Sequence, residues 1–218
     1  MKGKVMTRNL RFLCLALVAM LTMGIAASSA MAAAEFHLET TPSELTGVQE
    51  GTNTFATDSG TFHCTSVKFT GSYSSQTTGT TVLTPFTSGC RSTGFTEANI
   101  TIDTNGCKYN LTAEGTTSSS IHITGCNSGT AGIVITAPFC TITVTPQTVG
   151  PVHYINTGAG TTREVIAEFT ASNLVYHESG AACKNATTSN TTGGSYTGKV
   201  RLTGENPTTK AHHGIWWL

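Results

Sequence analysis

The residues with the clearest chemistry in this sequence are cysteines. Six of the seven lie beyond the first 34 residues: Cys64, Cys90, Cys107, Cys126, Cys140 and Cys183. Zinc sites use C-x2-C pairs or histidines at helical spacing, and this set has neither. An even number of cysteines in an exported chain instead forms disulfides that stay oxidised. The sequence therefore predicts three disulfides.

A nucleophilic serine is suggested by one local pattern, Asp58-Ser59-Gly60 followed by His63. A serine hydrolase requires a nucleophile, a histidine base and an orienting acid, held together in space. Asp, Ser and Gly in succession are also typical of a tight turn, which needs no further partner. We favour the turn, and the sequence predicts no catalytic residue.

The acidic and histidine side chains give no further site. Carboxylates that a glycosidase could pair are sparse, and we expect them to face solvent: Glu97, Asp103, Glu114, Glu164, Glu168 and Glu178. The histidines lack the spacing of metal ligands. Asp103-Thr104-Asn105-Gly106 is similar to the start of a calcium loop, but the later acidic ligands are missing. The sequence thus predicts no metal and no cofactor.

The N-terminal residues have the pattern of a signal peptide over 1–34. Lys2, Lys4, Arg8 and Arg11 are followed by the apolar run from Phe12 to Ala26 and then by small residues. Cleavage fits after Ala34 and almost as well after Ala32, and an uncleaved anchor is the alternative. No later run is long enough to span a membrane. The chain is therefore predicted to be secreted, either extracellular or at the cell surface.

Removal of these residues changes the charge. The chain has 12 basic and 12 acidic residues, and the first 34 residues hold four of the basic ones and no acidic one, which leaves eight basic against twelve acidic. Binding to nucleic acid needs clustered Lys and Arg, and none cluster here. A nucleic-acid partner is therefore disfavoured.

The elements that position these residues read as strands, because apolar and polar residues alternate. Cys140, Ile142 and Val144 alternate with threonines, and Tyr196, Val200 and Leu202 keep the same phase with Gly198 filling a gap. Residues 98–112 are predicted to form a hairpin around Asn105-Gly106. About a dozen such strands predict an all-β antiparallel sandwich or barrel-like meander of short threonine-rich strands over 35–206. Residues 207–218 are expected to be a flexible C-terminal tail.

This strand reading also suggests the cysteine partners. Two arms, 60–71 and 80–89, place Cys64 opposite Cys90. Cys107 and Cys126 lie opposite each other about a centre near Thr116, which leaves Cys140 with Cys183. For the second pair, Cys126 is out of phase with the preceding isoleucines, so a bulge is needed to bring it to their face.

The cysteine contexts resemble those of a family of uncharacterised secreted proteins of actinobacteria. The resemblance spans about residues 47–204 and lies in these segments: Gly60-Thr61-Phe62-His63-Cys64, Leu83-Thr84-Pro85, Ser88-Gly89-Cys90, Ile102 to Tyr109, Thr141-Ile142-Thr143-Val144 with Gln147, and Gly194-Ser195-Tyr196-Thr197-Gly198. It implies a signal-bearing, multi-cysteine, all-β protein and no particular activity.

Two features suit binding better than catalysis. Trp216 and Trp217 stand beside the C-terminus, where packing onto the sheet is expected. Thr141, Thr143 and Thr145 form a row that a polysaccharide could contact, although threonine is so common here that we favour an ordinary solvated face. We therefore expect a non-enzymatic extracellular β-protein that binds a cell-wall or other extracellular polymer. The alternatives are a secreted hydrolase with a site assembled from distant loops, and a structural protein that self-associates.

Overall fold

The computed structural model describes residues 34–93, 99–114, 118–127, 132–184, 186 and 190–218. These residues form an all-β fold of sixteen strands with one 3-10 turn, Gly160–Thr162. The predicted signal peptide, 1–34, lies outside the described residues except for Ala34. Within the described ranges, no helix is both long and apolar enough to cross a membrane.

The strands are, in chain order, β1 (Phe36–Leu38), β2 (Ser43–Gln49), β3 (Thr54–Thr57), β4 (Gly60–Tyr73), β5 (Thr77–Thr78), β6 (Thr80–Thr93), β7 (Thr101–Asp103), β8 (Lys108–Glu114), β9 (Ser118–Thr124), β10 (Ile133–Ala137), β11 (Cys140–Val144), β12 (Thr148–Thr157), β13 (Glu164–Ser179), β14 (Thr191–Glu205), β15 (His212–His213) and β16 (Ile215–Trp217).

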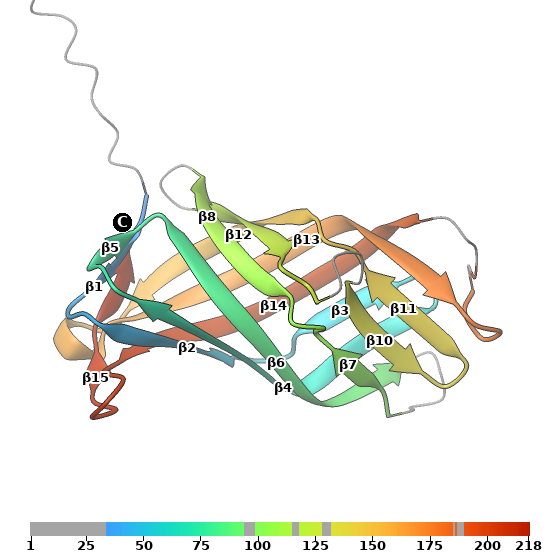
Figure 1. The fold of residues 1–218 in the computed structure, drawn as a ribbon, viewed down its shortest axis with the longest axis horizontal. Helices are drawn as coiled ribbons and strands as arrows, with labels where there is room; N and C mark the ends of the chain where they lie inside the picture. The colour runs from blue at the N-terminus through green and yellow to red at the C-terminus, as the bar shows by residue number, and fades with distance from the viewer. Residues whose placement is uncertain (1–33, 94–98, 115–117, 128–131, 185, 187–189) are drawn as a thin grey trace, which may run out of the picture. The chain divides into compact units, whose positions relative to one another are not determined.

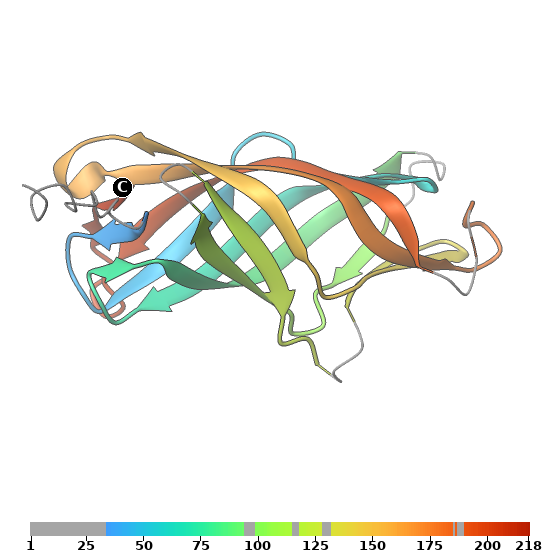
Figure 2. The same ribbon diagram turned by 90° about the horizontal axis from the view of Figure 1, so that it is seen from above.

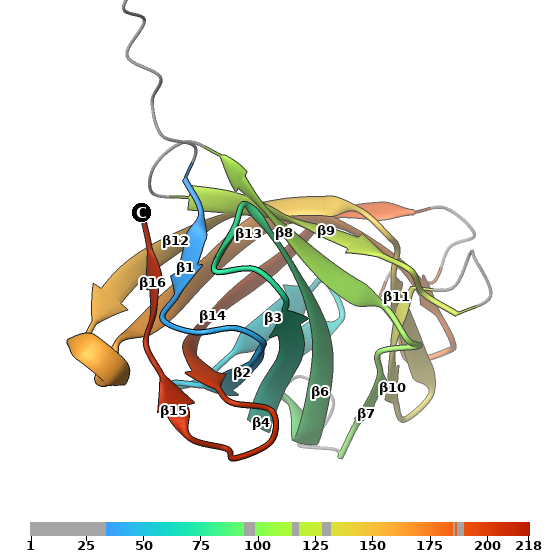
Figure 3. The same cartoon turned by 60° about the vertical axis from the view of Figure 1, so that its left-hand side comes forward.

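Eight of these strands form a sheet that closes on itself. The antiparallel order is β14-β2-β4-β6-β8-β9-β12-β13, and β13 pairs with β14 again to complete the ring. Figure 1 shows β4, β6 and β8 on the near side of this ring, and Figure 3 turns one end of it forward. The sequence predicted either a sandwich or a barrel-like meander, and the closed strand order corresponds to the second of these.

Four long strands continue beyond this ring, as Figure 2 shows from above. They are β4, β6, β13 and β14, with 14, 14, 16 and 15 residues. Beyond the ring, β3 takes the place of β2 between β14 and β4. On the other side β7, β10 and β11 pair in order and reach β13. The Ile100 N–H donates to the Cys90 carbonyl at 3.1 Å, which links this second group to the end of β6.

Apolar side chains alternate along the strands and fill the interior. In β11, Cys140, Ile142 and Val144 are buried, whereas Thr141 and Thr143 are half-buried. The buried hydrophobic residues form one continuous cluster to which nearly every strand contributes. The alternation that predicted the strands therefore also marks the side chains that form the core.

The hairpin predicted over 98–112 is wrong in its pairing. Asn105 and Gly106 do form a tight turn, with φ of 50° and 69°. The strands on its two sides take different neighbours, because β7 pairs with β10 while β8 pairs with β6 and β9. The turn therefore carries the chain from one group of strands to the other.

The three disulfides join the cysteines as predicted. Cys64–Cys90 links paired positions of β4 and β6, Cys107–Cys126 links the start of β8 to the segment after β9, and the third is Cys140–Cys183. Cys126 lies beyond the end of β9, after Gly125 with φ of 63°. This left-handed residue supplies the change of phase that the pairing required.

Residues 207–218 differ from the expected flexible tail. β15 pairs with β14, and β16 pairs with β1, which also pairs with β5 in a small separate sheet. The Trp217 ring lies 4.7 Å from that of Phe36 and 4.3 Å from that of Tyr154. Asn156 holds both backbone groups of Trp217 at 2.7 Å. The segment is fixed because Ile215 and Trp217 bury their side chains.

Candidate functional site

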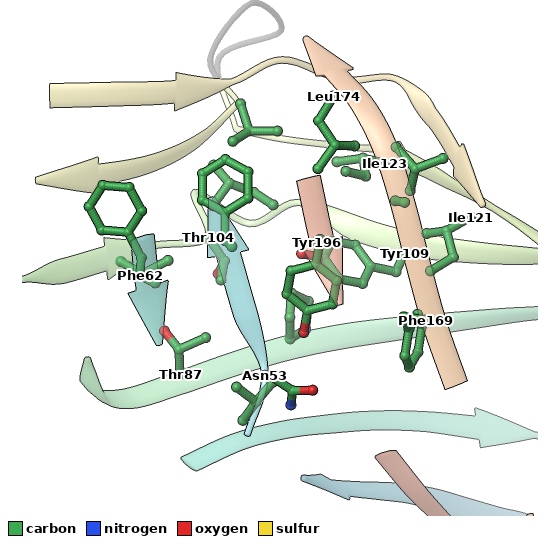
Figure 4. Close-up of a pocket in the computed structure, with 18 of the residues that line it drawn as sticks. Asn53, Phe62, Thr87, Thr104, Tyr109, Ile121, Ile123, Phe169, Leu174 and Tyr196 are labelled. Carbon is green, nitrogen blue, oxygen red and sulfur yellow. The ribbon is translucent and has the colours of Figure 1, made fainter. Parts of the chain in front are cut away.

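The strands enclose a cavity of about 130 Å³, which is lined both by strands of the closed ring and by strands beyond it. Side chains from β3, β4, β6 to β14 and the segments between them line it, so residues far apart in sequence meet there. Figure 4 shows these side chains converging from strands on all sides. A cavity of about 150 Å³ with apolar walls is able to bind benzene, so this one has room for a group of about that size.

Aromatic and aliphatic side chains form most of the wall. The Phe69 ring lies 5.7 Å from Tyr109 and 6.4 Å from Phe169, which in turn lies 6.3 Å from Tyr196. Isoleucines from β9 and β10 also line the cavity: Ile121, Ile123, Ile133 and Ile135. These are the inward members of alternating strands, so the fold itself makes the cavity apolar.

Among the described residues, the lining contains no Asp, Glu, Lys or Arg. Tyr109 and Tyr196 contribute phenol groups, and burial raises the pKa of both above the ordinary value of 10.0, with Tyr109 adding to the effect on Tyr196. Both side chains are therefore neutral hydrogen-bond donors and acceptors at physiological pH. His63 on β4 is also part of the lining.

One amide stands out in this apolar wall. Asn53 is 3 % exposed, and in the described part of the chain neither its Nδ2 nor its Oδ1 has a hydrogen-bond partner. It precedes β3, in the break where β3 takes over from β2 beside β14. Figure 4 shows its side chain among the residues that line the cavity. The Thr87 hydroxyl, on β6, is a second buried lining group without a partner.

Gly198 on β14 makes room for the Asn53 amide. A Cβ at this position would overlap Asn53 Oδ1. The neighbours of Gly198 in the inward row, Tyr196 and Val200, both carry large side chains. The gap in the alternation at Gly198 is therefore filled by Asn53. Sequence reasoning noted the gap but missed the asparagine, because nothing local marks Asn53 as buried.

The Ser59 candidate is part of a different arrangement. The Ser59 Oγ donates to Glu178 Oε2 at 2.6 Å and accepts from the Lys184 N–H at 2.8 Å. Ser59 lies in the turn between β3 and β4, as the turn interpretation required. His63 lies instead on β4 and lines the cavity. The structure therefore places the hydroxyl against a carboxylate and a backbone amide.

The carboxylates considered as catalytic pairs are scattered. Glu178 is fully buried, which corrects the expectation that it faces solvent. Glu164 pairs with Arg201 and Glu168 with Lys199 on the surface. Asp103 Oδ1 accepts from the Asn105 N–H at 2.8 Å, which is a turn contact, and Glu97 lies outside the described residues. In the described part of the chain, no group of three His, Cys, Asp or Glu residues could hold a metal ion.

A second, shallow hollow lies at the turn between β10 and β11. Phe139 is 82 % exposed and has φ of 59°, an unusual conformation for an aromatic residue. Thr136, Thr141 and Ser179 line the same hollow, and Thr141 pairs with both of the other two across the sheet. The threonine row expected on β11 thus adjoins an exposed aromatic ring.

Comparison with protein-family models, curated proteins and solved structures finds no match to this chain. The resemblance to a family of secreted actinobacterial proteins therefore stays a prediction. The function has to be argued from the two sites themselves.

Proposed function

We propose that this protein is an exported, non-enzymatic binding protein that holds a small apolar molecule inside its closed sheet. The observation that carries this proposal is the interior cavity of about 130 Å³ with walls of Phe, Ile, Val and Tyr side chains. Binding sites for small molecules are concave, mostly apolar and equipped with a few polar groups. The cavity has all three properties.

The three disulfides support export, since such bonds persist in oxidising compartments. Cys64–Cys90 also joins β4 and β6, two strands that line the cavity. The proposed function involves no covalent step. The one serine considered as a nucleophile is engaged by Glu178 and Lys184 instead.

Toluene is a suitable first probe, because it is apolar and about the size of the cavity. We expect saturable binding to the oxidised protein by calorimetry, together with a rise in melting temperature, since a ligand bound only by the folded state stabilises it. In the Ala171→Leu variant, extra carbons enter the cavity from β13, and we expect toluene affinity to fall about tenfold or more.

The matched control is Ser172→Leu, which adds a leucine at the next, exposed residue of the same strand. It should bind toluene as the unmodified protein does. If the unmodified protein shows no saturable binding, or if Ala171→Leu binds as tightly as the control, the proposal fails.

A second candidate function, favoured by the exposed ring of Phe139, is binding to an extracellular polysaccharide. Aromatic rings beside hydroxyl groups suit sugars, which present apolar faces and hydroxyls together, and Thr136, Thr141 and Ser179 supply the hydroxyls. We expect the oxidised protein to be retained on insoluble cell wall or polysaccharide in a salt-tolerant manner, and Phe139→Ala to lower retention about tenfold.

Phe86→Ala is the control for this experiment, because Phe86 is also exposed, at 54 %, but lies on β6 away from the hollow. Equal retention of the two variants, or no retention of the unmodified protein, would contradict polymer binding through Phe139. The cavity proposal would be unaffected.

A further inference from the structure

We infer that the molecule in the cavity carries one uncharged hydrogen-bonding group, such as a hydroxyl, a carbonyl or an amide, and that this group pairs with Asn53. This inference rests on the proposed function and names the class of ligand. It excludes fatty acids and other anions, and also amines, as the preferred occupants.

The unsatisfied amide of Asn53 is the first support. The residue is 3 % exposed, and both polar atoms of its side chain lack partners among the described residues. A buried polar group without a partner costs about 1–3 kcal/mol, and native proteins contain few of them. An amide in an apolar binding cavity is therefore best explained by a partner that arrives with the ligand.

The space around Asn53 is the second support. The Asn53 amide lies against Gly198 of β14, and the Cβ of any other residue at that position would overlap the amide. Glycine inside a strand weakens that strand, so its presence calls for a packing or functional reason. Here the reason is that the Asn53 amide occupies the space beside Gly198. Two positions far apart in the sequence thus combine to hold an unsatisfied amide in the lining of the cavity.

The described lining residues include no Asp, Glu, Lys or Arg, and this favours an uncharged ligand. A carboxylate or an ammonium in this cavity would find no oppositely charged side chain among the described lining residues. Burial of an unpaired charge is far less favourable than burial of a neutral polar group. An amide both donates and accepts, so it accommodates a hydroxyl or a carbonyl equally well. The Thr87 hydroxyl offers a further neutral contact.

The test compares three probes of nearly equal size: toluene, benzyl alcohol and benzoate. Dissociation constants are measured by calorimetry for the unmodified protein and for Asn53→Leu, at pH 8, where benzoate carries its negative charge. For each protein we take the ratio of the dissociation constants of toluene and benzyl alcohol. The two probes differ in solubility, but this difference is the same for both proteins and cancels when the two ratios are compared. We expect Asn53→Leu to shift this ratio about tenfold toward toluene. We expect benzoate to bind at least about tenfold more weakly than benzyl alcohol to the unmodified protein.

Failure of the inference is separable from failure of the proposed function. If toluene and benzyl alcohol both bind but Asn53→Leu leaves their ratio unchanged, the inference is overturned and the cavity proposal stands. Benzoate binding as tightly as benzyl alcohol would likewise overturn the inference alone. If no probe binds the unmodified protein, both fail.

A measurement on the unmodified protein covers the case in which Asn53→Leu does not fold. The side-chain NH2 resonances of Asn53 are followed by nitrogen-15 NMR during titration. We expect benzyl alcohol to shift them in a saturable way and by more than saturating toluene does. Equal shifts with both probes would overturn the inference.

Discussion

At the scale of single residues, Ser59 joins three parts of the chain. Its hydroxyl donates to the buried Glu178 near the end of β13 and accepts from the backbone of Lys184. The neighbouring Asp58 N–H donates to the Tyr176 hydroxyl at 3.2 Å. The turn between β3 and β4 is therefore fastened to the far end of β13. A serine that has the sequence context of a nucleophile serves here to hold a turn in place.

The two tryptophans make a matched pair for a test of stability. Trp217 is 4 % exposed and packs on Phe36 and Tyr154, whereas Trp216 is half-buried and stacks between His37 and Arg163. Removal of a large buried ring costs about 3–5 kcal/mol, and removal of a surface ring costs much less. We expect Trp217→Ala to lower the free energy of unfolding in urea by about that amount.

Trp216→Ala is the control and should lower the free energy of unfolding by about 1 kcal/mol or less. Similar losses in the two variants would contradict the role of Trp217 as the buried contact between β16 and β1.

Residues differ in how much the sequence reveals of them. The cysteine partners could be predicted, because Cys64–Cys90 and Cys107–Cys126 each span a stretch in which the chain turns back, and Cys140 and Cys183 were then the remaining pair. Asn53 could not, because it follows an ordinary Gly-Thr pair and its burial arises from the break between β2 and β3. Glu178 was predicted to face solvent, since nothing near it in sequence shows that Ser59 lies against it.

At the scale of elements, alternation predicts where strands lie but not always which strands pair. The arms 60–71 and 80–89 do pair with each other, as β4 and β6. The Asn105-Gly106 turn also exists, yet its flanking strands separate to join β10 on one side and β9 on the other. A turn fixes only the path of the chain over a few residues. β7 has only three residues, so its pairing depends on which apolar side chains of other strands it can pack against. Those contacts depend on the arrangement of the whole sheet.

The C-terminal strands likewise could not be predicted from the alternation of apolar and polar residues. β15 and β16 have two and three residues, which is too short for any period to be recognised. β15 is held by pairing with β14, and β16 is held by pairing with β1, which is distant in sequence. A short segment with two tryptophans was thus expected to be loose, although its aromatic content already favoured packing.

At the scale of the whole molecule, burial of the tyrosines couples the fold to alkaline pH. Burial raises the pKa of all five above the ordinary value of 10.0: Tyr73, Tyr109, Tyr154, Tyr176 and Tyr196. Since the folded pKa exceeds the unfolded one, this stabilising contribution is complete below about pH 10 and is lost as pH rises beyond it. We expect little tyrosinate absorbance from the folded protein at pH 10, followed by ionisation and unfolding together at higher pH.

The control is the same titration in concentrated guanidinium chloride, where the tyrosines should ionise about the ordinary value. The prediction is contradicted if the protein without denaturant ionises its tyrosines in the same pH range while its circular dichroism is unchanged.

The pairing of β1 with β16, and of β2 with β14, has a consequence for the order in which the molecule can be made. A chain is synthesised from its N-terminal end, so its first strands are available long before their partners. Until about the last thirty residues arrive, β2 can pair with β4 but lacks β14 on its other edge. An unpaired strand edge is a site of aggregation. Chains cut short near the C-terminus are left in that state permanently. Folding is therefore tied to the completion of synthesis, and delays along the way expose the same edge.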